Sequence, residues 1–411
     1  MRQWLNHQFI GILSLTLILI GLLLSNAAMS IGMIGLTVNT IFNKDFVLIF
    51  KRFIRHPALW GLSGIFILYA ISGLYSENIP FLIDRLRMKL PFLLLPFTIL
   101  SIPVFHKKLY YKLLYLFFIL VVMGCLYSVT LFLQDPWEIM ERYKQGQVLP
   151  TPVMHIRFSL MVAYAVGIGW YLYQERFFLR YAWEPLAMLV LTALLVAYLH
   201  LLAVRSGLVV LYSVLLFLLI WAVVRHRRYW LGVVAGSALL LAGWLAMRFV
   251  PSLQNKLDYT RYGLYLFQHR TNLEELSDSY RLGSMLAGAD IVRRHPSTGI
   301  GVGDIRQACE DYYRLHLPAL HGRGLMPHNQ YLFVAAATGL LGLCYFIWAI
   351  IYPLLYKKSY NNPLIVIFHI IMLLSFVPEH TLETQLGTAI YILFVILGIR
   401  FQDAVMENQV T

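Results

Sequence analysis

The sequence predicts an all-α, polytopic membrane protein with about 12 transmembrane helices and a large, mostly helical loop between helices 9 and 10. Of its 411 residues, 59% are hydrophobic and only 13% are charged, and the mean hydropathy is +0.68. Such a chain has too little polar side chain to cover the surface of a soluble globule. Apolar runs near the length of a bilayer span recur along it.

Twelve segments have the composition of transmembrane helices, although the fourth and eleventh are short. They are residues 9–25, 27–43, 58–75, 88–103, 110–133, 156–174, 185–204, 206–224, 231–250, 329–352, 363–378 and 385–400. An even number of spans puts both termini on one side. The predicted organisation is one integrated membrane domain, with helices 1–9 in residues 1–250, the loop in 251–328, and helices 10–12 with a short tail in 329–411.

Basic residues predict the orientation. The formal net charge is +13, and most basic residues fall in short clusters between apolar runs. Such clusters are typical of cytoplasmic loops, so both termini are expected in the cytoplasm and the long loop on the outer face. The same distribution argues against a nucleic-acid partner. The clusters are Lys44, Lys51, Arg52 and Arg55; His106, Lys107, Lys108 and Lys112; Arg176 and Arg180; Arg225, Arg227 and Arg228; Lys357 and Lys358; and Arg400.

The first apolar segment has two interpretations. It follows Met1-Arg2 and precedes the small residues Ser25-Asn26-Ala27-Ala28, as a cleaved signal peptide would. A second apolar segment follows at once, however, which favours an uncleaved first span.

Neither a metal site nor a cofactor is predicted. Two of the three cysteines, Cys125 and Cys344, lie inside spans, and Cys309 is alone in the loop, so there is no disulfide framework. The 13 histidines include no pair at helical metal-ligand spacing with a carboxylate partner. A phosphate-binding P-loop motif is also absent from the sequence.

Two helices are predicted within the long loop. From Ser279 to Arg294, apolar residues recur at steps of three and four, and Pro296 ends the run. A second helix is expected to run to about His316, with Asp304 as its N-cap.

The segment that connects these two helices has a glycine at every second position, at Gly299, Gly301 and Gly303. Glycines ahead of a helix can present bare amides to an anion. A plain tight turn is the alternative interpretation, because the strand that precedes a dinucleotide-binding fingerprint is missing here.

Three side chains have unusual positions. Arg205 interrupts the apolar run 186–224 at an outer turn, where an arginine is costly unless it is paired, hydrated or able to reach the interface. Arg281 opens the first loop helix, where contact with solvent or with a lipid phosphate is as good an interpretation as a role in a site. His328 follows Pro327 at the start of span ten, where an interfacial histidine would be unremarkable. Position alone does not decide among these alternatives.

In combination these residues resemble the O-antigen ligase and polymerase family of the bacterial inner membrane. The resemblance covers residues 200–345 by motif, and the whole chain by its twelve-span plan. Each motif is short, and their order and topology make them specific. The motifs are Arg205-Ser206-Gly207; Arg281 followed by His295-Pro296-x-x-Gly299-x-Gly301-x-Gly303; Pro327-His328-Asn329-x-Tyr331-Leu332; and Gly339-Leu340-x-Gly342-Leu343.

The resemblance implies transfer of a glycan from undecaprenyl diphosphate to an acceptor hydroxyl, such as one on lipid A-core, at the periplasmic face and without a metal. It assigns Arg205 and Arg281 to the diphosphate and His328 to the acceptor, as general base. Arginine offers a permanent charge and a planar fork of donors. Histidine, with an ordinary pKa of about 6.5, is largely neutral near pH 7 and can take a proton.

Other functions remain open. An O-antigen or exopolysaccharide polymerase, or a protein O-oligosaccharyltransferase, would use the same donor chemistry with another acceptor, so the motifs do not separate them from a ligase. A transporter is disfavoured, because the polar residues gather at the outer face and not near the midplane.

Secondary site residues are also predicted. The candidates for contact with the donor or with membrane lipids are Arg85, Arg87 and Lys89 at the outer end of span four, unless that span boundary is misplaced. The motifs add Gly301, Gly303 and Asn329. The candidates for an acceptor groove, with ordinary interfacial residues as the favoured alternative, are His155 and Arg157 before span six and Glu379, His380 and Glu383 before span twelve.

Overall fold

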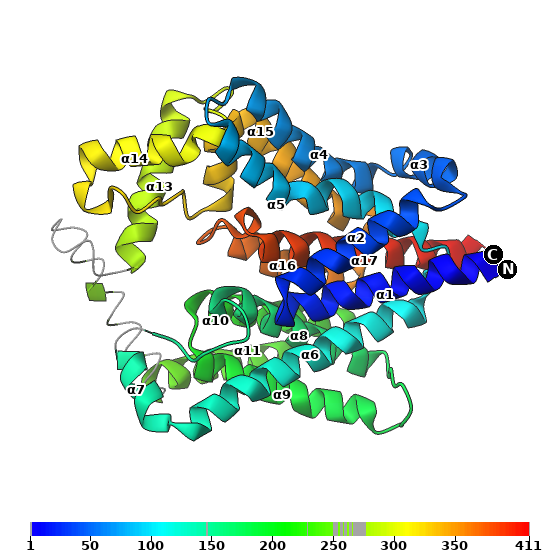
Figure 1. Cartoon of the computed structure of the whole chain (residues 1–411). Coiled ribbons are helices and arrows are strands. Elements are labelled where there is room, and N and C mark those ends of the chain that lie inside the picture. The colour runs from blue at the N-terminus through cyan, green and yellow to red at the C-terminus, as the bar shows by residue number, and fades with distance from the viewer. Residues whose placement is uncertain are drawn as a thin grey trace. The chain divides into compact units, whose positions relative to one another are not determined.

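The computed structural model describes residues 2–144, 147–227, 229–249 and 277–410, together with residues 254, 258, 261, 262 and 265. Every regular element in this part of the chain is a helix (Figure 1), which confirms the all-α class. Most of residues 250–276, the first part of the predicted loop, lies outside the described residues.

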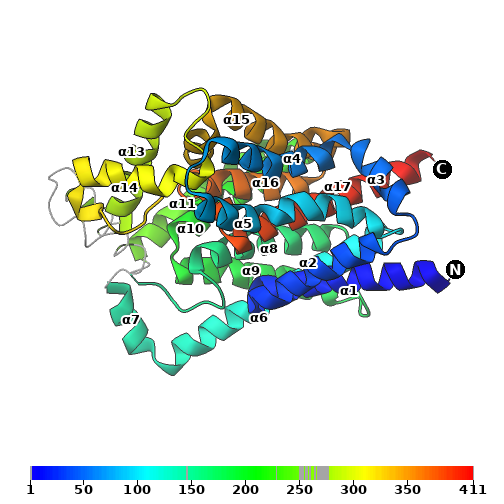
Figure 2. The same ribbon diagram turned by 45° about the horizontal axis from the view of Figure 1, so that its top comes forward.

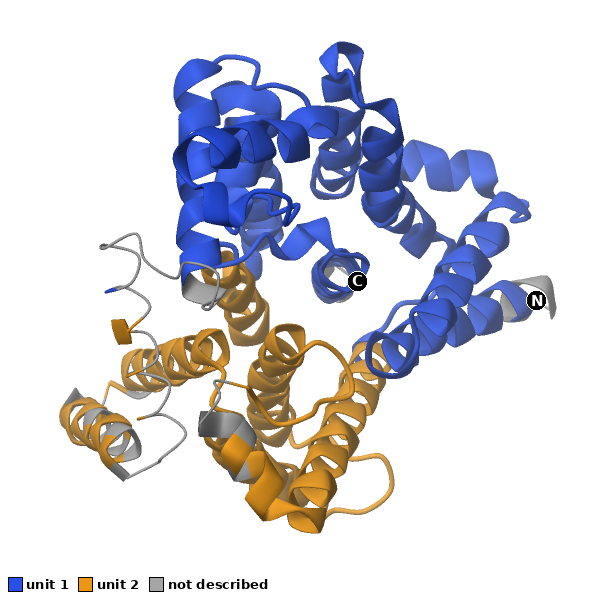
Figure 3. Ribbon diagram, turned by 60° about the vertical axis from the view of Figure 1, so that its left-hand side comes forward, with its two compact units in different colours: residues 1–107, 263–359, 376–411 blue, residues 108–262, 360–375 orange. Residues whose placement is uncertain are grey.

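The chain divides into two compact units (Figure 3). The first comprises Met1–Lys107, Gly263–Ser359 and Phe376–Thr411, and the second comprises Lys108–Tyr262 and Tyr360–Ser375. These units are defined by contacts in space, so they cut across the predicted sequence segments 1–250, 251–328 and 329–411. That predicted division stays a prediction.

The first unit contains the two chain ends and the described part of the long loop. Its helices are α1 (Arg2–Leu24), α2 (Asn26–Ile41), α3 (Phe46–Ile54), α4 (Pro57–Ser72), α5 (Ile79–Thr98), α13 (Ser277–Arg294), α14 (Ile305–His316), α15 (Gln330–Leu355) and α17 (Gln385–Val410). Short 3-10 turns join them: η1 (Gly73–Tyr75), η2 (Ile99–Ser101), η4 (Val302–Asp304), η5 (Pro318–Leu320), η6 (Tyr356–Asn361) and η7 (Thr381–Glu383).

The second unit is built from the middle of the chain plus one later helix. Its helices are α6 (Lys107–Gln134), α7 (Pro136–Lys144), α8 (His155–Gln174), α9 (Glu184–Leu202), α10 (Arg205–His226), α11 (Tyr229–Phe249) and α16 (Pro363–Ser375). Helix α16 packs against α8 and α10, far from it in the sequence.

Eight segments of the described chain are long and apolar enough to cross a membrane, so the protein is a multi-pass membrane protein. Helices α2 and α3 add a ninth if they are one span bent by 108°. Helix α5 is not among them, because it carries Asp84, Arg85, Arg87 and Lys89. The predicted total of twelve therefore stays a prediction. The eight are Asn6–Leu24, Pro57–Tyr75, Lys107–Gln134, His155–Gln174, Glu184–Leu202, Arg205–Arg225, Gln330–Asn361 and Gln385–Glu407.

Both chain ends lie at the same end of the first unit, and α13 and α14 lie at the opposite end (Figures 1 and 2). The loop helices agree with the sequence prediction: α13 covers the expected 279–294, and α14 ends at His316. The described part of the loop is therefore largely helical and separated from the termini by the length of the unit.

Helix α15 is broken at Gly339, where φ is 71° and ψ is −177°. A break leaves backbone groups without helical partners, and in apolar surroundings these must be paired. The partners come from residues 296–301, which contain Gly299 and Gly301 and are called the glycine turn below. Ile300 and Gly301 donate to the carbonyls of Ala336 and Ala337 at 3.0 and 2.9 Å, and the Leu340 amide donates to the Pro296 carbonyl at 2.8 Å.

Close backbone approach explains why glycine occupies both sides of this contact. A Cβ on Gly339 would lie 2.1 Å from the Ser297 carbonyl oxygen, and one on Gly299 would lie 2.5 Å from the Ala337 carbonyl carbon. Both glycines also have positive φ. The turn and the helix break therefore fit each other only without side chains.

Asp304 is the N-cap residue of α14, as the sequence predicts, but its side chain has another role. It makes no capping hydrogen bond to that helix. Its carboxylate instead accepts from the amides of Glu77 and Asn78 at 2.9 and 2.8 Å. These amides precede α5, so the aspartate ties the loop to the start of α5.

Candidate functional site

His328 lies in the short segment that leads into α15, in the first unit. The Asn329 side chain holds this segment in place through both its oxygen and its nitrogen. Its side-chain oxygen accepts from the Leu332 amide at 2.9 Å, which caps α15, and its nitrogen donates to the Val377 carbonyl at 2.9 Å. The N-cap thus holds His328 beside the turn at residues 376–380.

The ring of His328 is oriented by Ser284, a fully buried residue of α13. The Ser284 hydroxyl donates to the Arg281 carbonyl at 2.7 Å. Its oxygen lies 3.0 Å from Nδ1 of His328 and 3.1 Å from the His328 amide nitrogen. The His328 amide donates to this oxygen, and while the hydroxyl hydrogen is on the Arg281 carbonyl the oxygen can also accept from Nδ1. With the hydroxyl hydrogen on the Arg281 carbonyl, this arrangement favours the tautomer of His328 that carries its hydrogen on Nδ1 and its lone pair on Nε2.

Small residues on α13 allow this contact. Ser284 and Gly288 face the segment that leads into α15, and Gly283 faces Leu317 and Leu320 at η5. A Cβ on Gly288 would lie 2.8 Å from Cγ of Pro327, and one on Gly283 would lie 2.3 Å from a methyl carbon of Leu320. The helix can therefore approach closely enough for a short serine side chain to reach His328.

Arg281, one turn before Ser284, forms an ion pair with Glu379. Its Nη2 lies 2.7 Å from Oε1 of Glu379. The glutamate is buried, whereas 29% of the arginine side chain is exposed. A charge-assisted hydrogen bond to a buried carboxylate orients the guanidinium while leaving part of it accessible to solvent.

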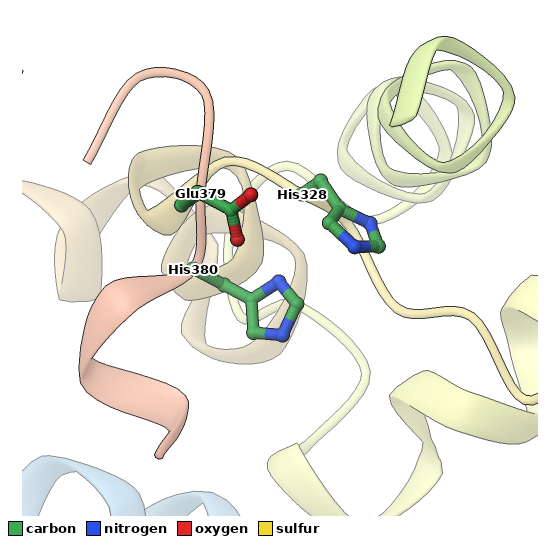
Figure 4. A group of neighbouring side chains, drawn as sticks. All are labelled: His328, Glu379 and His380. Carbon is green, nitrogen blue, oxygen red and sulfur yellow. The ribbon is translucent and has the colours of Figure 1, made fainter. Parts of the chain in front are cut away.

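The three side chains His328, Glu379 and His380 form one cluster (Figure 4). Their nitrogen and oxygen ligand atoms all lie within 4.8 Å of one another. The two imidazole rings meet edge to face, with centroids 4.8 Å apart. Together with Ser284 and Arg281, these residues form the candidate site of the first unit.

Arg205 lies in the second unit. It is the first residue of α10, after α9 ends at Leu202 and Ala203 takes a left-handed backbone conformation. The turn therefore lies at Ala203 and Val204, just before the predicted Arg205-Ser206-Gly207, which form the first turn of α10. A Cβ on Gly207 would lie 2.5 Å from Cβ of Ser159, so this glycine allows α10 to pack closely on α8.

Two further predicted residues lie at the start of α8, also in the second unit. His155 is its first residue and is half-buried. Arg157 is buried, and its Nη1 lies 3.4 Å from the sulfur of Met154.

Lys89 is wholly buried in the first unit and is paired with Glu383. Its Nζ lies 2.7 Å from Oε1 of Glu383, an oxygen that also accepts from Tyr69 at 2.7 Å and from Gln330 at 2.9 Å. Burial by itself raises the pKa of Glu383, but the Lys89 charge and the hydrogen bonds from Lys89, Tyr69 and Gln330 outweigh it and lower that pKa. The carboxylate is therefore ionised and holds residues 381–383 against α4, α5 and α15.

Arg85 is engaged in the same region. It donates to Asp84 at 2.7 Å and to the Glu383 carbonyl at 3.2 Å. Arg85 and Lys89 thus serve the turn that carries Glu379 and His380, which gives both side chains partners within the protein.

The loop glycines are also engaged internally. The Gly301 amide donates to Ala337, and the Gly303 amide donates to Ser76 at 3.2 Å. These amides point into the protein, as in the tight-turn interpretation of this segment.

Sequence reasoning missed Ser284 and the pairing of Arg281 with Glu379. A local signal for Ser284 existed, since it stands three residues after Arg281 in a run of small residues that includes Gly283, Ala287 and Gly288. The partner of Arg281 had no such signal, because it lies 98 residues away.

Fold and site define a multi-pass helical membrane protein with a polar cluster of histidine, arginine and carboxylate at the end of its first unit opposite the termini. Residues 187–347 match the family model described as O-antigen ligase. None of the curated proteins matches the chain. The match confirms the resemblance and includes Arg205, Arg281 and His328. It indicates glycosyltransferase activity of the O-antigen ligase or polymerase type.

Breaking the Lys89–Glu383 pair tests whether Lys89 has a structural role or binds the donor. Lys89→Met leaves a buried carboxylate without its cation, so we expect the free energy of unfolding to fall by about 3–5 kcal/mol, measured by thermal unfolding in detergent. Arg87→Met, at an exposed position of the same helix, should change it by less than about 0.5 kcal/mol. Adding Glu383→Gln to Lys89→Met should restore part of the loss. A Lys89→Met protein that is as stable as the parent but binds donor poorly would contradict this assignment.

Proposed function

We propose that the protein transfers a glycan from undecaprenyl diphosphate to an acceptor hydroxyl, on lipid A-core or a similar acceptor, at the periplasmic face of the bacterial inner membrane. The transfer needs no metal and inverts the anomeric carbon. The observation that carries the proposal is the contact of α13 with the segment before α15: Ser284, one turn after Arg281, bonds to the main-chain carbonyl of Arg281 and to the ring of His328. The contact brings together two motif residues of the O-antigen ligase match.

His328 acts as the general base. A sugar hydroxyl becomes a competent nucleophile when a positioned base takes its proton in the transition state. The hydrogen bond between Ser284 and Nδ1 supports this role, because it directs the lone pair of the ring to Nε2. Ser284 is then a positioning residue, which holds the tautomer and orientation of the ring.

Arg281 and Arg205 bind the donor diphosphate. Negative charge develops on the leaving group as the glycosidic bond breaks, and a guanidinium meets it with a permanent charge and paired donors. The partial exposure of Arg281 supports contact with a ligand. Arg205 stands at the amino end of α10, where the helix dipole also favours an anion. Attack opposite the departing diphosphate inverts the configuration.

The acceptor distinguishes the related activities. An O-antigen or exopolysaccharide polymerase extends another lipid-linked repeat, and a protein O-oligosaccharyltransferase modifies a protein, both with the same donor. Parallel assays with one donor and each class of acceptor separate the three. The O-antigen ligase match favours an enzyme over a membrane transporter.

The proposed orientation places both termini in the cytoplasm and α13 and α14 in the periplasm, because basic loops favour the cytoplasmic side. In a Cys344→Ala background, an impermeant maleimide applied to the outer face should label Gln307→Cys and spare Lys51→Cys. Both positions are exposed, and the remaining Cys125 and Cys309 are buried. Labelling in the opposite pattern would place the site in the cytoplasm and exclude the periplasmic reaction.

The arginine assignment predicts a loss of donor binding. Arg205→Ala and Arg281→Ala should each lower kcat/KM by about a hundredfold or more, since each removes a charged contact with the leaving group. Lysine at either position should recover only part, because it lacks the planar fork. Arg293→Ala is the matched control, at an exposed position of the same helix as Arg281. Parental affinity of the folded alanine variants for the lipid diphosphate would refute the donor role.

The base assignment predicts a loss of turnover. His328→Gln should lower kcat by about a hundred- to ten-thousand-fold and leave donor affinity nearly unchanged. Ser284→Ala should lower kcat less, since it loosens the ring without removing it. The control is His316→Gln, an exposed histidine of α14. The assays use purified protein, glycan-linked lipid diphosphate, acceptor and a chelator. Near-parental turnover of His328→Gln would limit His328 to positioning the acceptor.

A further inference from the structure

The cluster of His328, Glu379 and His380 has the composition of a transition-metal site. It offers two imidazoles and one carboxylate, with ligand atoms within 4.8 Å of one another (Figure 4). Two histidines and a glutamate are a donor set that zinc uses in proteins, with bonds of about 2.0–2.2 Å. Imidazole-rich sets of this kind also suit cobalt and nickel.

The local backbone allows these donors to close around an ion. Tetrahedral bonds of that length place donor atoms about 3.3–3.6 Å apart, so the cluster has to contract by roughly 1 Å. His328 lies in the segment before α15, and Glu379 and His380 lie in the turn between α16 and α17. Irregular segments accommodate such a shift more easily than the middle of a helix.

Two neighbours provide the outer support that metal ligands need. The oxygen of Ser284 lies 3.0 Å from Nδ1 of His328, and a hydrogen bond donated by Nδ1 leaves the lone pair on Nε2. Arg281 donates to Oε1 of Glu379 at 2.7 Å. Metal-bound histidines and carboxylates are oriented by such partners. The positive charge of Arg281 also opposes a cation, so we expect the ion to bind reversibly and to be removed by a chelator.

We propose that His328, Glu379 and His380 bind a divalent transition-metal ion, zinc above all, and that the bound ion suppresses glycan transfer. The ion takes the lone pair of His328 that would otherwise accept the proton of the acceptor hydroxyl. The binding does not depend on the proposed function, whereas the suppression rests on it. Transfer therefore proceeds without metal, and zinc acts as an inhibitor at the base.

Cobalt binding tests the site without any substrate. The purified, chelator-treated full-length protein should take up one equivalent of Co²⁺ with visible d–d absorption bands, and Zn²⁺ should abolish the bands. His328→Ala and His380→Asn should weaken binding at least tenfold, as loss of a metal ligand requires. The matched control is His321→Ala, which removes another histidine–carboxylate pair, with His321 Nδ1 3.1 Å from Glu310. It should bind cobalt like the parent.

Two results would overturn the metal site. One is a parent protein that binds no more cobalt than His328→Ala does. The other is a His380→Asn protein, folded by its thermal transition, that binds cobalt as well as the parent.

Inhibition is measured as the ratio of transfer rates with and without zinc in each variant. Zinc should slow the parent and His321→Ala at least tenfold, and it should leave the ratio for His380→Asn near one. Equal ratios in the parent and His380→Asn would overturn the suppression. If the chelated parent transferred no glycan at all, the proposed function would fail, while the cobalt spectra would still decide the metal site.

Discussion

The packing of α13 on α15 in the first unit depends on the hydrogen bonds between the glycine turn and the break in α15. A helix interrupted at Gly339 exposes carbonyls and an amide that apolar surroundings cannot satisfy. Ile300, Gly301 and Pro296 supply the missing partners. Because α13 ends just before this turn, at Arg294, the same contact sets where α13 packs along α15. The meeting of Ser284 with His328 follows from that packing.

A second constraint is the buried charge behind the site. Lys89 and Glu383 gain their Coulomb attraction at the cost of desolvation, so such a pair contributes more to a specific arrangement than to net stability. Here the pair is completed by Tyr69 and Gln330, and Gln330 is two residues from His328. The network therefore links the start of α15 to the turn that carries Glu379 and His380. Its side chains are removed from solvent, whereas Arg281 is partly exposed.

The proposed base chemistry and the proposed metal binding use the same atoms. A histidine whose Nδ1 is held by a neighbour presents Nε2 either to a proton or to an ion. The charge of Arg281 affects the two ligands in opposite ways, because it attracts an anionic donor and repels a metal cation. A site with one guanidinium, one carboxylate and two imidazoles can therefore serve a reaction without metal and still be sensitive to metal.

The sequence by itself determined the features that depend on local pattern. The apolar runs and their period of three to four residues define the helical membrane class and the bounds of α13 and α14, since each helix satisfies its own backbone. Short motifs also predict Arg205, Arg281 and His328 as site residues. Only the tertiary structure decided what these residues contact. The Asp304 side chain accepts from the Glu77 and Asn78 amides and not from its own helix. Arg281 pairs with Glu379, and His380 joins His328. Such partners lie far apart in the chain, and a pairwise contact at that separation leaves no periodic trace in the sequence, because it depends on how whole helices pack.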